Sequence, residues 1–288
     1  MRRVIGTISL LGAIALGANQ SAAESVTLEN GIDVAYDSQG SGEKTVILVH
    51  GYSFAKEIWS RAMPHLSDGW RLIAYDIRGF GDSTKPDDGY DYPTMANDLR
   101  LFMDALDVDE AVLIGHSMGG ILIQDFATTY PERVSGLVLA NVHARNRPPL
   151  GMNDDFQATI DAWGDAETNR EIFQGFTPVF FKAENLRDGD LDELISMNVK
   201  SGTAALKQAL ETIFTTEAMS AETWEAIDMP VLIVASTNDV IPCGTEGWLL
   251  DSLPQSDIVV FKRVRHTPMW EKPEAFAEAV NGFLDTLN

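Results

Sequence analysis

A short apolar run that ends in a Gly-x-Ser-x-Gly turn constrains the fold of this chain more than any other feature. The run covers residues 111–114, the turn at residues 115–119 reads Gly-His-Ser-Met-Gly, and a helix-like pattern follows at once. A serine that stands clear of a sheet edge needs a sharply bent, strained backbone, and flanking glycines leave room for that bend. The order strand, turn, helix therefore predicts that Ser117 is a nucleophile. The free N–H groups of the new helix would face negative charge that forms on a substrate.

Strand-like and helix-like patterns alternate on both sides of this turn. A β-hairpin is expected around Asn30-Gly31, because this dipeptide suits a tight turn. Six further strands are expected at residues 45–49, 71–75, 111–115, 134–140, 231–235 and 258–261. Helices are expected near residues 56–66, 92–106, 118–130, 245–253 and 273–287. The alternation predicts an α/β fold with a mostly parallel central sheet, helices on both faces, and working loops at the carboxyl ends of the strands.

The pattern changes between residues 145 and 227, where we find no convincing strand. Helix-like stretches occur there at residues 153–163, 167–181, 190–200 and 203–214. We therefore expect a helical cap at residues 145–227, inserted into a core formed by residues 24–144 and 228–288. Four aromatic residues of this segment either form the core of the cap or line an apolar pocket: Phe173, Phe176, Phe180 and Phe181.

Residues 1–23 are typical of a secretory signal peptide. Two arginines precede an apolar stretch at residues 4–18, and Ser21-Ala22-Ala23 offers small residues where a signal peptidase cleaves. The stretch is too short, and too rich in glycine and alanine, for a secure membrane span. We expect cleavage after Ala23 and a periplasmic or secreted protein, with an uncleaved N-terminal anchor as the alternative.

The chain is strongly acidic, with 43 acidic and 21 basic residues and a formal net charge of −22. Nucleic acids and anionic membranes bind through basic patches, so this balance argues against either as a partner. We expect a small-molecule substrate and no membrane contact beyond export.

A serine hydroxyl becomes a good nucleophile only when a base takes its proton and a third group orients that base. Asp239 follows one late predicted strand and His266 follows the next. Serine, acid, histidine is the chain order that accompanies this kind of turn in an α/β sheet. His143 is the rival base. Asp76 is the rival acid, although its place before a glycine-punctuated loop suits a role in bracing that loop.

Acyl transfer also needs N–H donors that face the developing oxyanion. We expect two backbone donors. One is the N–H of Met118, directly after the nucleophile. The other is the N–H of Tyr52, after His50-Gly51, where the glycine lets the chain turn inward.

These features together resemble the α/β-hydrolase fold family, in its branch of serine esterases, lactonases and cofactor-free haloperoxidase-like enzymes. The resemblance covers nearly all of residues 24–288. Its motifs are His50-Gly51, Asp76-x-Arg78-Gly79-x-Gly81-x-Ser83, Gly115-His116-Ser117-Met118-Gly119-Gly120, Asp239, and His266 with Glu271-x-Pro273-Glu274. The resemblance implies an α/β-hydrolase fold with an inserted cap and a Ser117–His266–Asp239 triad. It also implies that no metal or organic cofactor is needed.

The chain departs from the family pattern at two positions. Arg265 stands before the histidine, where the family often has glycine, and Pro242 follows the acid one residue sooner than is common. Both departures concern the shapes of the acid and histidine loops. Serine at the turn argues against the dehalogenase and epoxide-hydrolase branches, which have aspartate there.

The resulting expectation is a carboxylesterase- or lactonase-like hydrolase that acts on esters or lactones through an acyl-enzyme on Ser117. One alternative keeps the triad and changes the chemistry to cleavage of carbon–carbon bonds, cleavage of amides at peptide N-termini, or perhydrolase and haloperoxidase reactions. A further alternative is a ligand-binding sensor with vestigial turnover.

Overall fold

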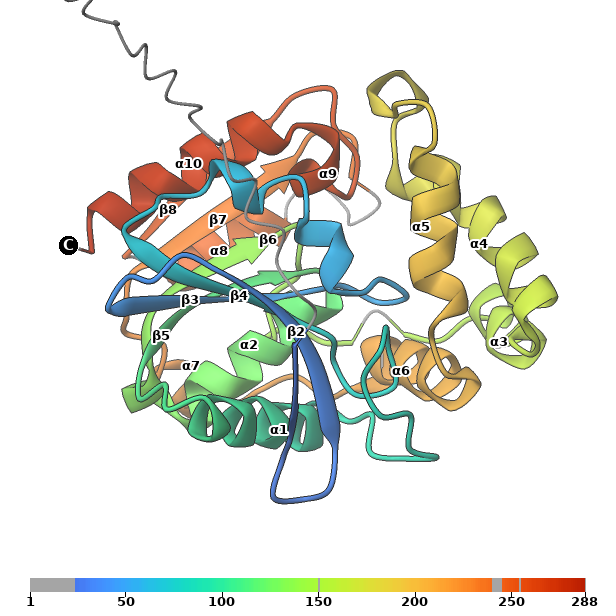
Figure 1. Ribbon diagram of the computed structural model, residues 1–288, viewed down its shortest axis with the longest axis horizontal. Coiled ribbons are helices and arrows are strands. Elements are labelled where there is room, and N and C mark those ends of the chain that lie inside the picture. The colour runs from blue at the N-terminus through green and yellow to red at the C-terminus, as the bar shows by residue number, and fades with distance from the viewer. Residues whose placement is uncertain (1–23, 150, 240–244, 254, 288) are drawn as a thin grey trace, which may run out of the picture.

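A computed structural model describes residues 24–149, 151–239, 245–253 and 255–287. The predicted signal peptide at residues 1–23 and the proline at position 242 lie outside the described residues. The chain forms an eight-stranded sheet in the order β1-β2-β4-β3-β5-β6-β7-β8, flanked by helices (Figure 1). The predicted fold class is therefore confirmed.

The sheet is antiparallel at one edge and parallel elsewhere. β1 pairs with β2 and β2 with β4 in antiparallel fashion, and all later pairs are parallel. The strands are β1 Glu24–Thr27, β2 Asp33–Gln39, β3 Lys44–Val49, β4 Trp70–Tyr75, β5 Ala111–His116, β6 Val134–Ala140, β7 Val231–Ser236 and β8 Ser256–Phe261. Because β3 and β5 to β8 run in the same direction, the loops after β5, β7 and β8 leave the same edge of the sheet.

Both faces of the sheet are buried. Alternate side chains of β5 point to opposite faces, so Leu113 joins one apolar core and Val112 the other. The helices of the first face are α1 Tyr92–Ala105, α2 Met118–Thr129 and α8 Thr245–Ser252. The second face is covered by η1 Lys56–Trp59, η2 Met63–His65, α9 Pro268–Glu271 and α10 Pro273–Asp285. A short 3₁₀ turn, η3, covers Pro131–Arg133.

All the regular elements that the structure describes between β6 and β7 are helices. These are α3 Asp154–Ala162, α4 Ala166–Phe180, η4 Ala183–Asn185, α5 Asp190–Val199, α6 Thr203–Thr215 and α7 Ala221–Trp224. Figure 1 shows α3, α4, α5 and α6 grouped on one side of the molecule, apart from the sheet. We refer to these helices as the cap. Among the described residues, no helix has the length and apolar character that crossing a membrane requires.

The prediction of a single helix near residues 56–66 is wrong. The chain forms two 3₁₀ turns there, and Ser60 N–H bonds to the carbonyl of Glu57, three residues back, at 3.0 Å. Pro64 has no N–H to donate to the carbonyl of Ser60, so a continuous α-helix would lose a bond at this point. In contrast, α4 continues past Pro178 to Phe180.

Candidate active site

Ser117 lies between the end of β5 and the start of α2, in a backbone conformation that few non-glycine residues adopt. Its φ is 51° and its ψ is −120°. Its N–H donates to the carbonyl of Ala140 at 3.0 Å, and its carbonyl accepts from Ile121 N–H at 3.0 Å. These two bonds hold the strained residue between the neighbouring strand β6 and the first turn of α2. The predicted nucleophile therefore stands at the carboxyl edge of the sheet.

Close backbone contacts explain the glycines around Ser117. A Cβ on Gly119 would lie 2.4 Å from the carbonyl oxygens of Val49 and His50. A Cβ on Gly51 would lie 3.1 Å from the Cβ of Ser117 and 2.7 Å from Nδ1 of His116. The loop after β3 is therefore packed directly against the serine turn. This loop carries Tyr52, the predicted source of one oxyanion N–H donor.

The side chain of Tyr52 is anchored away from this backbone role. Its phenol is buried and donates to the carbonyl of Leu206 in α6 at 2.7 Å. Burial raises the pKa of the phenol well above 10, so it stays a donor. The second predicted donor, Met118, opens α2, where the first N–H groups of a helix have no partner within it.

The structure brings the predicted base and acid together. Nδ1 of His266 lies 2.6 Å from Oδ1 of Asp239, and the two side chains are 3% and 1% exposed. An Nδ1–H that donates to the carboxylate leaves Nε2 as the basic nitrogen. The ring of His266 lies 4.7 Å from that of His116, the residue before Ser117. Residues from three strand ends thus meet at one edge of the sheet.

His116 belongs to the turn at residues 115–119, the serine turn. It supports the loop at residues 262–267 that carries His266, which we call the histidine loop. Its Nε2 lies 2.8 Å from the carbonyl oxygen of His266 and, because a carbonyl only accepts, must carry the proton. Burial lowers the pKa of His116 well below 6.5, with a further contribution from the neighbouring His266. His116 therefore stays neutral and keeps this bond at neutral pH.

Two residues that sequence patterns did not assign to the site also hold the histidine loop. Nδ2 of Asn141 donates to the carbonyl of Arg265 and to Oγ of Ser236, each at 3.0 Å. Asn141 follows β6 with a φ of 47°, a conformation that asparagine tolerates better than most residues. An asparagine directly after a predicted strand is the only sequence signal for this role.

Glu271 is the second such residue: it belongs to the family motif quoted with His266, but that motif gave it no role in the site. Its Oε1 accepts from Arg265 N–H at 2.9 Å and from Thr267 Oγ1 at 3.5 Å, both beside His266. Its Oε2 accepts from Lys182 N–H at 3.0 Å and from Asn185 Nδ2 at 2.8 Å, just after α4. One buried carboxylate therefore joins the histidine loop to the cap.

The rival acid Asp76 braces loops instead of facing His266. Its fully buried carboxylate accepts from Lys56 N–H at 2.7 Å, from Lys56 Nζ at 3.1 Å and from Asp82 N–H at 2.8 Å. The rival base His143 makes no ion pair with a carboxylate among the described residues. Burial, together with the charges of Arg145 and Arg147, lowers the pKa of His143 to about 4. The geometry favours Asp239 and His266 over both rivals.

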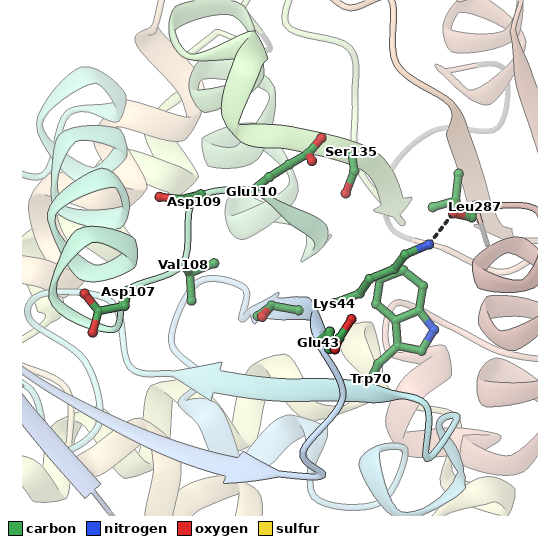
Figure 2. Close-up of a pocket in the computed structure, with 10 residues that line it drawn as sticks. Glu43, Lys44, Trp70, Asp107, Val108, Asp109, Glu110, Ser135 and Leu287 are labelled. Atoms are coloured by element: carbon green, nitrogen blue, oxygen red, sulfur yellow. Dashed lines mark hydrogen bonds between the residues drawn. The ribbon is translucent and has the colours of Figure 1, made fainter.

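A cavity of about 460 Å³ lies at the other edge of the sheet, among the amino ends of β3, β4 and β6 (Figure 2). Its walls include Lys44, Trp70, Glu110 and Ser135, and Lys44 Nζ donates to the carbonyl of Leu287 at 2.7 Å. None of the predicted site residues lines it. In the described parts of the chain, no group of three histidine, cysteine or acidic residues is placed to hold a metal ion.

The mostly parallel sheet flanked by helices and the serine turn at the end of β5 define a class of α/β proteins. The chain belongs to the α/β-hydrolase fold family, whose family model matches residues 44–273. It is therefore an enzyme of this hydrolase superfamily.

Two relatives and one solved structure show how widely the similarity extends. A Bacillus subtilis (strain 168) protein, provisionally named 2-succinyl-6-hydroxy-2,4-cyclohexadiene-1-carboxylate synthase, is 28% identical over 91% of this chain and 98% of its own. The 3-oxoadipate enol-lactonase 2 of Acinetobacter baylyi is 27% identical over 80% of this chain and 85% of its own. A thermophilic esterase from Thermogutta terrifontis superposes with a TM-score of 0.79 at 25% identity, over 93% and 99% of the two chains.

Proposed function

We propose that this protein hydrolyses carboxylic esters or lactones through an acyl-enzyme on Ser117. The observation that carries the proposal is the bond of 2.6 Å between buried His266 and Asp239, next to the strained serine turn. A histidine oriented by a carboxylate, beside an activated serine, suits acyl transfer. Similarity to an enol-lactonase and to an esterase supports the same substrate class.

The proposed reaction has two halves. Oγ of Ser117 attacks the carbonyl carbon while Nε2 of His266 takes the hydroxyl proton, and Asp239 stabilises the imidazolium. The N–H groups of Tyr52 and Met118 hold the oxyanion. The C–O bond then breaks, and His266 gives its proton to the leaving alcohol. A water molecule, deprotonated by His266, attacks the carbonyl carbon of the acyl-enzyme. The bond from this carbon to Oγ of Ser117 then breaks, His266 returns the proton to Oγ, and the acid leaves.

Turnover of p-nitrophenyl acetate by the wild type and by Ser117→Ala tests the proposal. We expect the wild type to turn over and the variant to lose at least about 10³-fold in kcat. Ser135→Ala is the matched control, because Ser135 lies on the amino edge of the same sheet. Absence of wild-type turnover on p-nitrophenyl acetate and on longer acyl homologues, or unchanged turnover in Ser117→Ala, would contradict the proposal.

Other uses of the same triad form the second candidate. The similarity to a protein named as a synthase shows that relatives of this chain carry names outside ester hydrolysis. A panel of a 1,3-diketone, an amino-acid p-nitroanilide, and acetate with hydrogen peroxide and bromide separates these chemistries. We expect the highest kcat/KM on esters or lactones, and a higher value on any other member of the panel would replace the first proposal.

A further inference from the structure

The structure divides the four aromatic residues of the cap into two kinds. Phe173 and Phe181 are 0% and 1% exposed and belong to the apolar core. Phe176 and Phe180 are half-buried and lie one helical turn apart in α4, with ring centroids 5.8 Å apart. Half-buried aromatic rings near a catalytic edge are available to a ligand, whereas the fully buried pair is not.

Phe180 contacts the catalytic base in two ways. Its carbonyl accepts from His266 N–H at 3.0 Å and from Thr267 Oγ1 at 3.2 Å. Its ring stacks on the imidazole of His266, with centroids 5.6 Å apart and planes 28° from parallel. Any residue at this position could make the main-chain bonds. The stacking needs an aromatic ring, so this second contact depends on the side chain.

The ring of Phe180 also reaches the loop that carries the predicted oxyanion donor. Its centroid lies 5.9 Å from that of Phe54, two residues after Tyr52. Phe54 in turn lies 6.0 Å from His116 in the serine turn. The ring of Phe180 therefore contacts both the loop that carries His266 and the loop after β3 that carries Tyr52.

We propose that Phe180 forms the wall of the leaving-group side of the site and that the protein prefers esters with an apolar, above all aromatic, alcohol portion. The inference rests on the ester hydrolysis proposed above. During acylation His266 gives its proton to the leaving oxygen, so this oxygen must lie within hydrogen-bond reach of Nε2. The substituent on that oxygen then extends along the imidazole, where Phe180 offers its ring. Offset stacking and burial of apolar surface favour an aromatic group there.

A comparison of benzyl acetate and ethyl acetate tests this assignment. Both esters form the same acetyl-enzyme, so the ratio of their kcat/KM values reports only steps up to release of the alcohol. We expect Phe180→Ala to lower this benzyl-to-ethyl ratio about tenfold. Phe156→Ala is the control variant, because Phe156 is also a half-buried cap aromatic and stacks on Phe214 at 3.9 Å, away from His266. It should leave the ratio unchanged.

A second pair of substrates separates the two sides of the site. Phenyl acetate and phenyl butyrate share a leaving group and differ in the acyl chain, so Phe180→Ala should change their kcat/KM values by the same factor. A selective loss on the butyrate would place Phe180 on the acyl side and overturn the proposal. An equal loss on benzyl and ethyl acetate would reduce Phe180 to a support for His266. If the wild type hydrolyses none of these esters, the ester-hydrolase proposal fails first.

Discussion

The loops of the core that carry the proposed triad and the helices of the cap are held in place in different ways. In the core, the loops that carry Ser117, Asp239 and His266 follow β5, β7 and β8 of the parallel part of the sheet, so the sheet itself sets their spacing. Buried polar side chains such as His116 and Asn141 then fasten the histidine loop. Each part of this edge is short and tied to a strand end.

The cap depends on separate contacts between residues far apart in the chain. α5 is docked by an ion pair between Arg61 and Asp190 and by Lys200, which lies 3.1 Å from both Glu57 and Asp82. In α3, by contrast, Ile160 is the one buried residue among the described positions. The comparison teaches that the strand-end loops should be sensitive to single hydrogen bonds, whereas the cap should tolerate the loss of any one contact.

The largest effect on kcat is expected at Asp239, in the loop after β7. In Asp239→Asn the amide can donate to Nδ1 of His266, which moves the ring proton to Nε2 and removes the base. We expect kcat on p-nitrophenyl acetate to fall about 10³- to 10⁴-fold with little change in stability. Asn238→Ala, one residue earlier, serves as the control. A loss of less than about tenfold in Asp239→Asn would assign the acid role to another residue.

Glu271 should give the next largest effect, because it links the two regions. All four partners of its carboxylate are donors, so the amide of Glu271→Gln cannot satisfy both sides. A histidine loop displaced by about 1 Å should lower kcat about 10- to 100-fold. Steady-state kinetics on p-nitrophenyl acetate measures this loss.

Glu274→Gln provides the matched control for this position. Glu274 lies three residues later, is exposed, and makes no hydrogen bond or ion pair among the described residues. Activity equal to the wild type in both glutamine variants would show that the link through Glu271 does not position His266.

His143 should make the stability of the core edge dependent on pH. Its folded pKa of about 4 lies below the unfolded value of 6.5, so the unfolded chain binds the proton first as the pH falls. The free energy of unfolding therefore decreases between pH 6.5 and pH 4, by about 1.4 kcal/mol per unit where only the unfolded state is protonated. When the pH falls from 7.5 to 5, the free energy of unfolding of His143→Gln should decrease by about 2 kcal/mol less than that of the wild type. Urea unfolding at both pH values measures the difference.

The histidine at position 65 provides the comparison for this experiment. His65 is exposed, so His65→Gln should keep the pH dependence of the wild type. If His143→Gln also kept the pH dependence of the wild type, the loop after β6 would be open to solvent, in conflict with the burial of His143 in the structure.

Sequence patterns predicted the core edge far better than the cap contacts. β6 has the expected bounds, and β3 and β7 differ from expectation by one residue at one end. This accuracy has a physical reason, since a strand buried on both faces must be a continuous apolar run. Contacts such as that of Asn141 with Arg265 join residues 124 positions apart and leave no local pattern. The stacking of Phe180 on His266 also joins residues far apart in the chain. The sequence pattern could therefore only place Phe180 among the aromatic residues of the cap.

The smallest effect is expected at Lys200, on the side of the cap. Burial opposes ionisation of Asp82, but bonds and charges from Lys200 and Lys56 outweigh it and hold the pKa of this carboxyl below its usual value. Lys56 also lies 3.3 Å from Asp82, so one ion pair should remain when Lys200 is replaced. Lys200→Met should therefore lower the free energy of unfolding by no more than about 1 kcal/mol, with kcat nearly unchanged.

The ionic nature of this contact gives it a signature in salt. The carboxyl pKa is lowered in the folded state, so the stabilisation is present above the unfolded carboxyl pKa and is lost as the pH falls through the folded one. The difference between the wild type and Lys200→Met in urea unfolding at pH 7.5 should shrink from 0.05 M to about 1 M salt. Lys262→Met is the control, because Lys262 is exposed and has no ion pair in the described part of the chain. A loss of kcat as large as that of Glu271→Gln would show that the cap is as sensitive to single contacts as the strand-end loops.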